Sequence, residues 1–317
     1  MKIVIAPDSF KESLDALAVA KAIETGFKRV FPHAQYDLIP MADGGEGTVQ
    51  SLVDATQGRI ERVSVTGPLG ECVRAFFGVS GDGKTAFIEM SAASGLHLVP
   101  VAQRNPLTTT SYGTGELIKA ALDQGAKHII LGLGGSATND AGAGMLQALG
   151  VRFLDAQGRS VAWGGAALAS LVQMDLSQLD ARLADIRIQV ACDVDNPLCG
   201  VRGASAVFGP QKGATPAQVT QLDAALAHFS SVVVQQTGRD IANIAGAGAA
   251  GGMGGGLMLL PHAQLQSGVQ IVAEAVRLAE RVRDADLVIT GEGRMDGQSV
   301  HGKTPIGVAR VAKQFDK

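Results

Sequence analysis

Three short apolar runs, each followed by a loop with glycine or aspartate, constrain the fold of this chain more than any other feature. They are residues 3–6, 128–131 and 287–290. Each has the length of a β-strand and is apolar at nearly every position, which is typical of parallel strands covered on both faces. In residues 14–30, apolar side chains recur every three or four positions after Ser13, the expected N-cap. This alternation predicts an α/β protein with a doubly wound, mostly parallel, Rossmann-like sheet.

A change of pattern after residue 58 predicts a second domain. Residues 60–65, 73–79 and 85–90 favour β-structure and are separated by glycine-containing turns, as in antiparallel hairpins. Strands and helices alternate again further along the chain, with strands at 128–131 and 186–191 and helices at 115–123, 139–149, 217–236 and 269–282. We therefore predict an outer domain of residues 1–65 and 283–317, with residues 66–282 inserted in it as a second α/β domain.

The outer domain has few predicted strands. Only residues 3–6, 36–40 and 287–290 can be assigned to its parallel sheet, fewer than the ~4–6 strands of a typical sheet. We therefore expect further strands of this sheet beyond Lys317, so that the outer domain is truncated at the C-terminus.

Composition excludes several classes of function. A net charge of −3 and an aromatic content of 4% provide neither a basic field nor stacking platforms for nucleic acid. The three cysteines contain no C-x-x-C pair, so neither a disulfide framework nor a structural zinc site is expected. We expect reduced thiols and a cytoplasmic protein. The longest uncharged run, residues 241–262, contains seven glycines and is therefore expected to be a loop rather than a membrane span.

Glycine is abundant, with 41 of 317 residues, and the loop at 132–140 follows a strand and opens a helix. Such a loop presents backbone N–H groups to phosphate, which makes Gly134, Gly135, Ser136 and Asn139 candidate nucleotide-binding residues. The loop differs from the Walker pattern, since the lysine of that pattern is absent. A tight turn with an Asn/Asp helix cap explains the same residues equally well.

Carboxylates follow several strands, at the sheet edge where open α/β sheets bind ligands. Asp8, Asp43 and Asp193 are in such positions. Asp193 is the predicted base that accepts a proton from a substrate hydroxyl, and Asp43 and Asp195 are the predicted ligands of Mg²⁺. An Asx-turn ahead of Pro197 is the competing explanation for the pair at 193 and 195.

Charged residues near both ends complete the candidate site. We predict that Asp8, Lys11, Arg294 and Asp296 bind the substrate, with Arg294 pairing with a carboxylate, and that Lys303 neutralises phosphate charge. Solvated surface charge is the alternative for each of them. The six histidines show no metal-ligand spacing.

Taken together, these segments identify a family. Residues 7–13, 42–48, 134–140, 208–214 and 291–296, in this order, resemble the type 1 glycerate kinase family of bacteria, and the resemblance extends from Met1 to Lys317. It implies transfer of the γ-phosphoryl group of ATP to a hydroxyl of D-glycerate, giving 2-phosphoglycerate, with Mg²⁺. Ala141 departs from the glycine usual in the family, and the family's chains continue past Lys317.

Two other functions remain as alternatives. A dehydrogenase of small hydroxy acids that uses NAD is disfavoured because no G-x-G-x-x-G turn follows the first strand. A non-catalytic metabolite-binding regulator is disfavoured because no basic helix is present to contact DNA. The expected partner is therefore a small molecule, with no nucleic acid and no membrane, and a homo-oligomer is left open.

Overall fold

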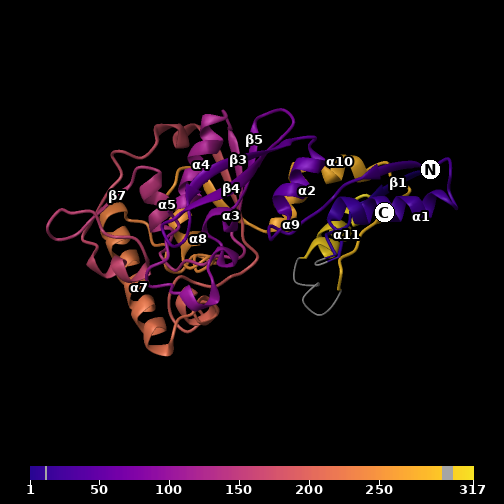
Figure 1. Cartoon of the computed structure of the whole chain (residues 1–317). Helices are drawn as coiled ribbons and strands as arrows, with labels where there is room; N and C mark the ends of the chain where they lie inside the picture. The colour runs from indigo at the N-terminus through magenta and orange to yellow at the C-terminus, as the bar shows by residue number, and fades with distance from the viewer. Residues whose placement is uncertain (11–12, 295–302) are drawn as a thin grey trace.

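Two large β-sheets lie in two lobes (Figure 1), and a two-stranded sheet accompanies them among the described residues. The computed structural model describes residues 1–10, 13–294 and 303–317. The smaller sheet has the order β11-β1-β2 and consists of β1 (Lys2–Ile5), β2 (Gln35–Leu38) and β11 (Leu287–Ile289). The larger has the order β10-β9-β6-β5-β4-β3 and consists of β3 (Arg59–Thr66), β4 (Cys72–Val79), β5 (Thr85–Glu89), β6 (His128–Gly132), β9 (Arg187–Ala191) and β10 (Ala263–Gln266).

Helices cover both sheets, and a small hairpin of β7 (Arg152–Leu154) and β8 (Gln173–Asp175) is separate from them. The α-helices are α1 (Ala16–Lys28), α2 (Thr48–Ala55), α3 (Ser91–Ser94), α4 (Tyr112–Asp123), α5 (Ala143–Ala148), α6 (Ala204–Phe208), α7 (Pro216–Thr237), α8 (Met253–Leu257), α9 (Gly268–Ala275), α10 (Leu278–Val282) and α11 (Thr304–Lys313). Among the described residues, no helix combines the length and apolarity that crossing a membrane requires.

The smaller sheet is parallel throughout and buried on both faces. On one face, Ile3 and Ile5 pack with Ala20 of α1. On the other face, Val4 packs in a cluster with Val282 of α10 and Val308 of α11. Apolar side chains at successive strand positions therefore point to opposite, equally buried layers, as the sequence predicted. The α/β class and the helices on both faces are confirmed.

The larger sheet combines two kinds of pairing. Strands β5, β6, β9 and β10 are parallel, whereas β3, β4 and β5 are joined by antiparallel hairpins, as predicted from the turns. Because β3 pairs with β4 along its whole length, residues 59–65 belong to the larger sheet and not to the outer domain. We therefore propose that the inserted part begins near residue 57 and ends near residue 267.

Two local predictions about helices were wrong. Asp15, not Ser13, caps α1, because its side chain accepts a hydrogen bond from the Ala18 backbone N–H at 2.7 Å. The single helix expected at 269–282 is two helices, α9 and α10, since Arg277 between them has a left-handed backbone with φ of 53°. A periodic apolar pattern survives such a break, because both helices bury their apolar faces in the same core cluster.

The two lobes meet where the loop after β2 crosses the carboxyl ends of β6 and β9. A Cβ atom on Gly132 would lie 2.4 Å from the carbonyl oxygen of Gly44, and one on Gly268 would lie 1.9 Å from that of Asp43. Gly44 in turn lies against the side chain of Ala191. Small residues therefore let the backbones of the two lobes touch, which fixes Asp43 at the junction.

We expect Gly268→Ala to destabilise the protein, because its new methyl group would overlap the Asp43 carbonyl oxygen. Overpacking of this kind costs ~1–3 kcal/mol. The matched control is Gly26→Ala in α1, where a Cβ meets no atom within 4 Å and the change should stabilise by ~0.5–1 kcal/mol. Urea unfolding measures the change in the free energy of unfolding for each variant. Equal changes in the two variants would contradict the close contact of the backbones at the junction.

Candidate active site

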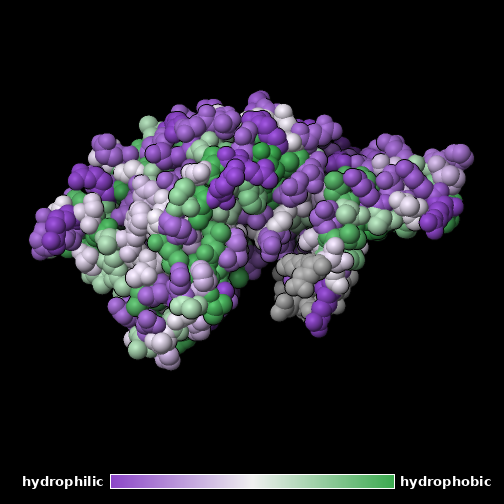
Figure 2. Space-filling view, in the orientation of Figure 1, coloured by the Kyte–Doolittle hydropathy of each residue, from purple (hydrophilic) through white to green (hydrophobic). Residues whose placement is uncertain are grey.

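Three carboxylates converge between the lobes, each from a loop that follows a strand. Asp8 follows β1, Asp43 follows β2 and Asp193 follows β9. Asp43 interacts electrostatically with both of the others. Figure 2 shows a notch between the two lobes, and a cavity of about 250 Å³ is lined by Asp8, Ser9, Asp43, Glu292, Gly293, Arg294 and Lys303. Each of these aspartates therefore lies in a loop that follows a strand, the position from which the sequence selected it as a candidate.

Asp8 is held rigidly at one side of this cavity. Its Oδ2 accepts a hydrogen bond from Thr304 Oγ1 at 2.6 Å, and its Oδ1 accepts one from the Ser9 N–H at 2.6 Å. Thr304 begins α11, so this bond ties the loop after β1 to the start of the last helix. Burial raises the pKa of Asp8, and the charge of Asp43 adds to that rise, while the bonds from Thr304 and Ser9 oppose it.

Asp193 does not line this cavity, but it interacts electrostatically with Asp43 and is held in a similar way to Asp8. Its Oδ1 accepts hydrogen bonds from Ser267 Oγ and from the Gly268 N–H, both at 3.0 Å. Burial raises the pKa of Asp193; the bonds from Gly268 and Ser267 oppose this rise, and the charge of Asp43 adds to it. A fixed carboxylate with a raised pKa has the properties of a general base.

Cationic side chains face these carboxylates. Lys303 Nζ lies 3.8 Å from Glu292 Oε2, and Arg294 lines the same cavity. Both come from the segment after β11, so the smaller sheet supplies them together with Asp8. The predicted substrate-binding residues Lys11 and Asp296 lie outside the described residues.

The glycine loop after β6 faces the notch with Gly134 and Gly135. Both are exposed, and their backbone N–H groups donate no hydrogen bond to another described residue. A Cβ on Gly134 would lie 3.5 Å from the Cα of Gly45, so this loop adjoins the loop that carries Asp43. The geometry therefore offers free donors beside a carboxylate, as a phosphate site requires.

Three of the predicted site residues do not face the notch. Ser136 is buried, and its hydroxyl accepts a hydrogen bond from Lys212 Nζ. Asn139 is fully buried, and its Nδ2 donates to Ser205 Oγ at 2.9 Å. The Asp195 carboxylate is 75% exposed and pairs with Arg202 at 2.8 Å, so the structure does not bring it to Asp43.

Sequence reasoning also missed contributors to the site. Ser267 and Thr304 hold the two outer aspartates; Ser267 precedes α9 and Thr304 begins α11. Lys212 is 1% exposed and lies beneath the glycine loop. Its segment, residues 208–214, carried the family resemblance, but a single lysine in a loop gives no sign that it is buried.

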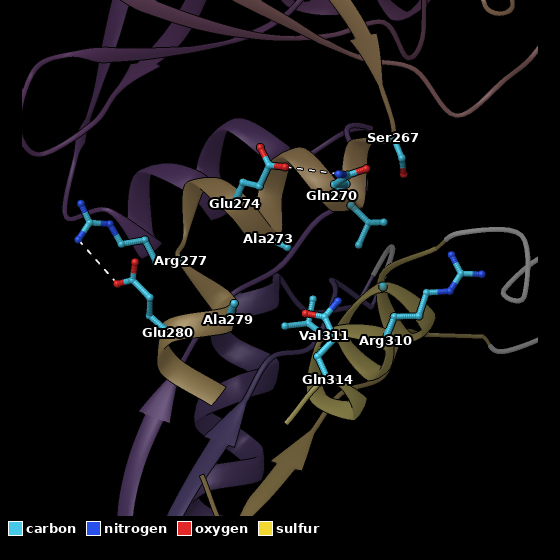
Figure 3. Close-up of a pocket in the computed structure, with 12 residues that line it drawn as sticks. Ser267, Gln270, Ala273, Glu274, Arg277, Ala279, Glu280, Arg310, Val311 and Gln314 are labelled. Atoms are coloured by element: carbon cyan, nitrogen blue, oxygen red, sulfur yellow. Dashed lines mark hydrogen bonds and ion pairs between the residues drawn. The ribbon is translucent and has the colours of Figure 1, made fainter. Parts of the chain in front are cut away.

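A separate groove of about 540 Å³ lies between α9, α10 and α11 (Figure 3). Its floor includes Ala273 and Val311. Charged groups on its rim pair locally, such as Arg277 with Glu280 at 3.9 Å. Ser267 lines one end of this groove and also bonds Asp193. Asp8 and Asp43, by contrast, line the smaller cavity, and Asp193 interacts with Asp43, so we assign the chemistry there.

The fold and the site together define a class of protein. The site combines aspartates at strand ends, an exposed glycine loop, and a lysine and an arginine near a notch between the lobes. These are the parts of an α/β phosphotransferase. The chain matches the profile of the glycerate kinase family over residues 3–317. It belongs to the glycerate kinase family.

Named relatives agree with this assignment. The chain is 68% identical to glycerate kinase of Haemophilus influenzae over 317 residues, which cover all of this chain and 84% of the relative. It is 59% identical to glycerate 2-kinase of Escherichia coli K12, covering 100% of this chain and 83% of the relative. A crystal structure assigned to glycerate kinase 2 of Salmonella typhimurium LT2 superposes with a TM-score of 0.97 at 60% identity. The match covers 100% of this chain and 85% of that chain.

We expect Asp8→Asn to stabilise the protein at pH 7 while abolishing most activity. The raised pKa of Asp8 means that its ionised form costs stability at every pH above that pKa. The amide oxygen still accepts the bond from the Ser9 N–H, and the amide NH2 can donate to the Thr304 hydroxyl, so both contacts are kept without the charge. Such a change commonly contributes ~0.5–2 kcal/mol. The gain should shrink as the pH falls through the raised pKa of Asp8, because the wild-type carboxyl then becomes protonated.

Thermal unfolding at several pH values checks this prediction. Asp185→Asn on the exposed surface is the control, and surface changes of this kind usually stay within about 0.5 kcal/mol. A loss of stability at pH 7, or a gain that does not depend on pH, would show that Asp8 is not a strained carboxylate.

Proposed function

We propose that this protein transfers the γ-phosphoryl group of ATP to the 2-hydroxyl of D-glycerate, giving 2-phosphoglycerate. The observation that carries the proposal is the meeting of Asp193, Asp43 and Asp8 with the exposed Gly134–Gly135 loop in one notch. Membership in the glycerate kinase family supports the reaction. The name of the Escherichia coli relative, glycerate 2-kinase, supports the position that is phosphorylated.

Asp193 is proposed as the base that accepts the proton of the attacking hydroxyl. Its raised pKa makes it a better proton acceptor than an exposed aspartate, and two hydrogen bonds to one oxygen leave Oδ2 available to the substrate. A base held in position can take the proton as the hydroxyl oxygen attacks phosphorus, without reorganisation.

Arg294 and Lys303 are proposed to neutralise the negative charges that meet in the cavity. Glycerate carries a carboxylate, for which a planar guanidinium offers two parallel donors. Phosphate oxygens suit the compact ammonium of Lys303, which lies at the start of α11. Asp8 lines the same cavity and is proposed to accept a hydrogen bond from a glycerate hydroxyl.

Mg²⁺ fits this donor set. No group of three or more metal-ligating side chains occurs among the residues described. Mg²⁺ in phosphoryl-transfer sites needs only one or two carboxylates, because phosphate oxygens and water complete its coordination. Asp43 would hold it, since the charge of Asp43 acts on both Asp8 and Asp193. When bound, the ion would neutralise phosphate charge during transfer.

We also propose that the protein acts in a reducing compartment, the cytoplasm. Cys72, Cys192 and Cys199 are free thiols in the structure. Burial raises the pKa of Cys192 and raises that of Cys199 to about 12. Both are therefore uncharged and unreactive near neutral pH.

We expect Asp193→Asn to lower kcat by on the order of 10²–10⁴ while KM for glycerate changes little, because an amide cannot accept the proton. The matched control is Asp195→Asn, two residues along, where the side chain is exposed and pairs with Arg202. Steady-state kinetics of ADP release separates the two constants. An unchanged kcat for Asp193→Asn, or an equal loss in both variants, would remove Asp193 as the base.

We expect Gly135→Ala to weaken ATP more than glycerate. Gly135 has φ of 74°, and a methyl group here would strain the loop that presents free N–H groups to phosphate. Gly83→Ala is the matched control, since Gly83 has φ of 72° in a hairpin turn and no atom within 4 Å of a Cβ. Binding of each ligand is measured by calorimetry; selective loss of glycerate would assign the loop to the other substrate.

A further inference from the structure

The structure contains a buried lysine that the proposed mechanism does not use. Lys212 ends the short turn Pro210–Lys212, and Gly213, with φ of 95°, then turns the chain against the backbone of Arg104. Only 1% of Lys212 is exposed. Its Nζ donates to Ser136 Oγ and to the Thr138 carbonyl oxygen, both at 2.7 Å. The lysine therefore holds the glycine loop from beneath.

Among the described residues, no carboxylate contacts the ammonium group of Lys212, whose hydrogen-bond partners are Ser136 and Thr138. Asp140 acts on it electrostatically, but its own oxygens accept hydrogen bonds from Ser111, Gly142 and Gly144. Burial lowers the pKa of Lys212 to about 7, against a partial rise from Asp140. A buried cation without a carboxylate in contact is costly, so another anion close by would relieve that cost.

The loop directly above Lys212 has the features of an anion site. On the side facing the notch, Gly134 and Gly135 present N–H groups that donate to no other described residue. On the inner side, Thr138 Oγ1 and Asn139 Oδ1 are buried without a hydrogen-bond partner. The loop thus has the buried ammonium group of Lys212 on its inner side and the backbone N–H donors of Gly134 and Gly135 on its outer side. No lysine ends the loop in sequence, where the Walker pattern has one.

We propose that Lys212 is the positioning residue of the phosphate loop, and that its ammonium group supplies from beneath the loop the positive charge for the nucleotide's phosphates. This inference rests on the proposed function and deepens it. The ammonium group fixes Ser136 and Thr138, which sets the direction of the N–H groups above them. Its field passes through the loop to the phosphates, where little water intervenes to screen it.

Proton linkage follows from this arrangement. Phosphates above the loop favour the charged form of Lys212, so nucleotide binding at pH 7.5 should take up a proton. Among the described residues, Asp140 acts electrostatically on Lys212, and the backbone of Arg104 lies against the neighbouring Gly213. Arginine stays charged at every accessible pH. An arginine at position 212 should therefore keep the charge and remove the proton uptake.

The first experiment is calorimetry of ATP binding to the whole chain at pH 7.5, in two buffers of different ionisation enthalpy. We expect the wild type to take up a fraction of a proton on binding ATP and Lys212→Arg to take up none. Subtracting the uptake of the variant from that of the wild type removes the protons bound by the nucleotide itself. Lys212→Met should weaken ATP by ~10–100-fold, as expected for loss of a charged donor, and should leave glycerate binding within about twofold. Lys84→Met, an exposed lysine, is the control.

The outcomes separate this inference from the proposed function. Equal proton uptake in wild type and Lys212→Arg, or equal weakening of ATP and glycerate by Lys212→Met, would overturn it. If a thermal melt shows that Lys212→Met does not fold, proton uptake by the wild type, measured at several pH values, tests the inference instead. This uptake must vanish well below pH 7 and reach its maximum above pH 7. ATP binding with the expected linkage but no phosphorylation of glycerate would instead contradict the proposed function and leave Lys212 in its role.

Discussion

The contact on which the site depends is the close approach of two backbones at the junction of the lobes. The carbonyl oxygens of Asp43 and Gly44 lie where Cβ atoms on Gly268 and Gly132 would be. Larger residues would separate the two sheets, and the carboxyl ends of their strands would no longer meet. With the sheets in contact, Asp43 interacts with Asp8 from its own lobe and with Asp193 from the other.

That contact has an electrostatic consequence. Three carboxylates from different strands share one notch, and burial together with Asp43 raises the pKa of both Asp8 and Asp193. Phosphates and a glycerate carboxylate would add further negative charge, so binding requires cations. Lys303 and Arg294 supply two, Mg²⁺ would supply another, and Lys212 lies behind the glycine loop. The repulsion among these aspartates therefore favours the ligand-bound state, because each cation that binds lowers that repulsion.

Sequence reasoning found the parts of the site that follow from strand ends. Asp8, Asp43 and Asp193 could be selected because each follows a predicted strand, and buried parallel strands end at one edge of a sheet. Asp195 was predicted to bind Mg²⁺ beside Asp43, but its side chain pairs with Arg202 in the same loop, and that pairing could not be predicted from the sequence. The left-handed turn at Arg277 likewise has no residue pattern that marks it.

The glycine loop shows why its polar residues divided into two groups. Gly134 and Gly135 face the notch, whereas Ser136 and Asn139 point inward and bond Lys212 and Ser205. From sequence, all four are equally polar or small, and only the tertiary fold decides which side each occupies. The inward bonds fix the loop before any ligand arrives, so the outward N–H groups need no reorganisation to meet phosphate. A loop built in this way requires polar residues inside the protein as much as glycines on its surface.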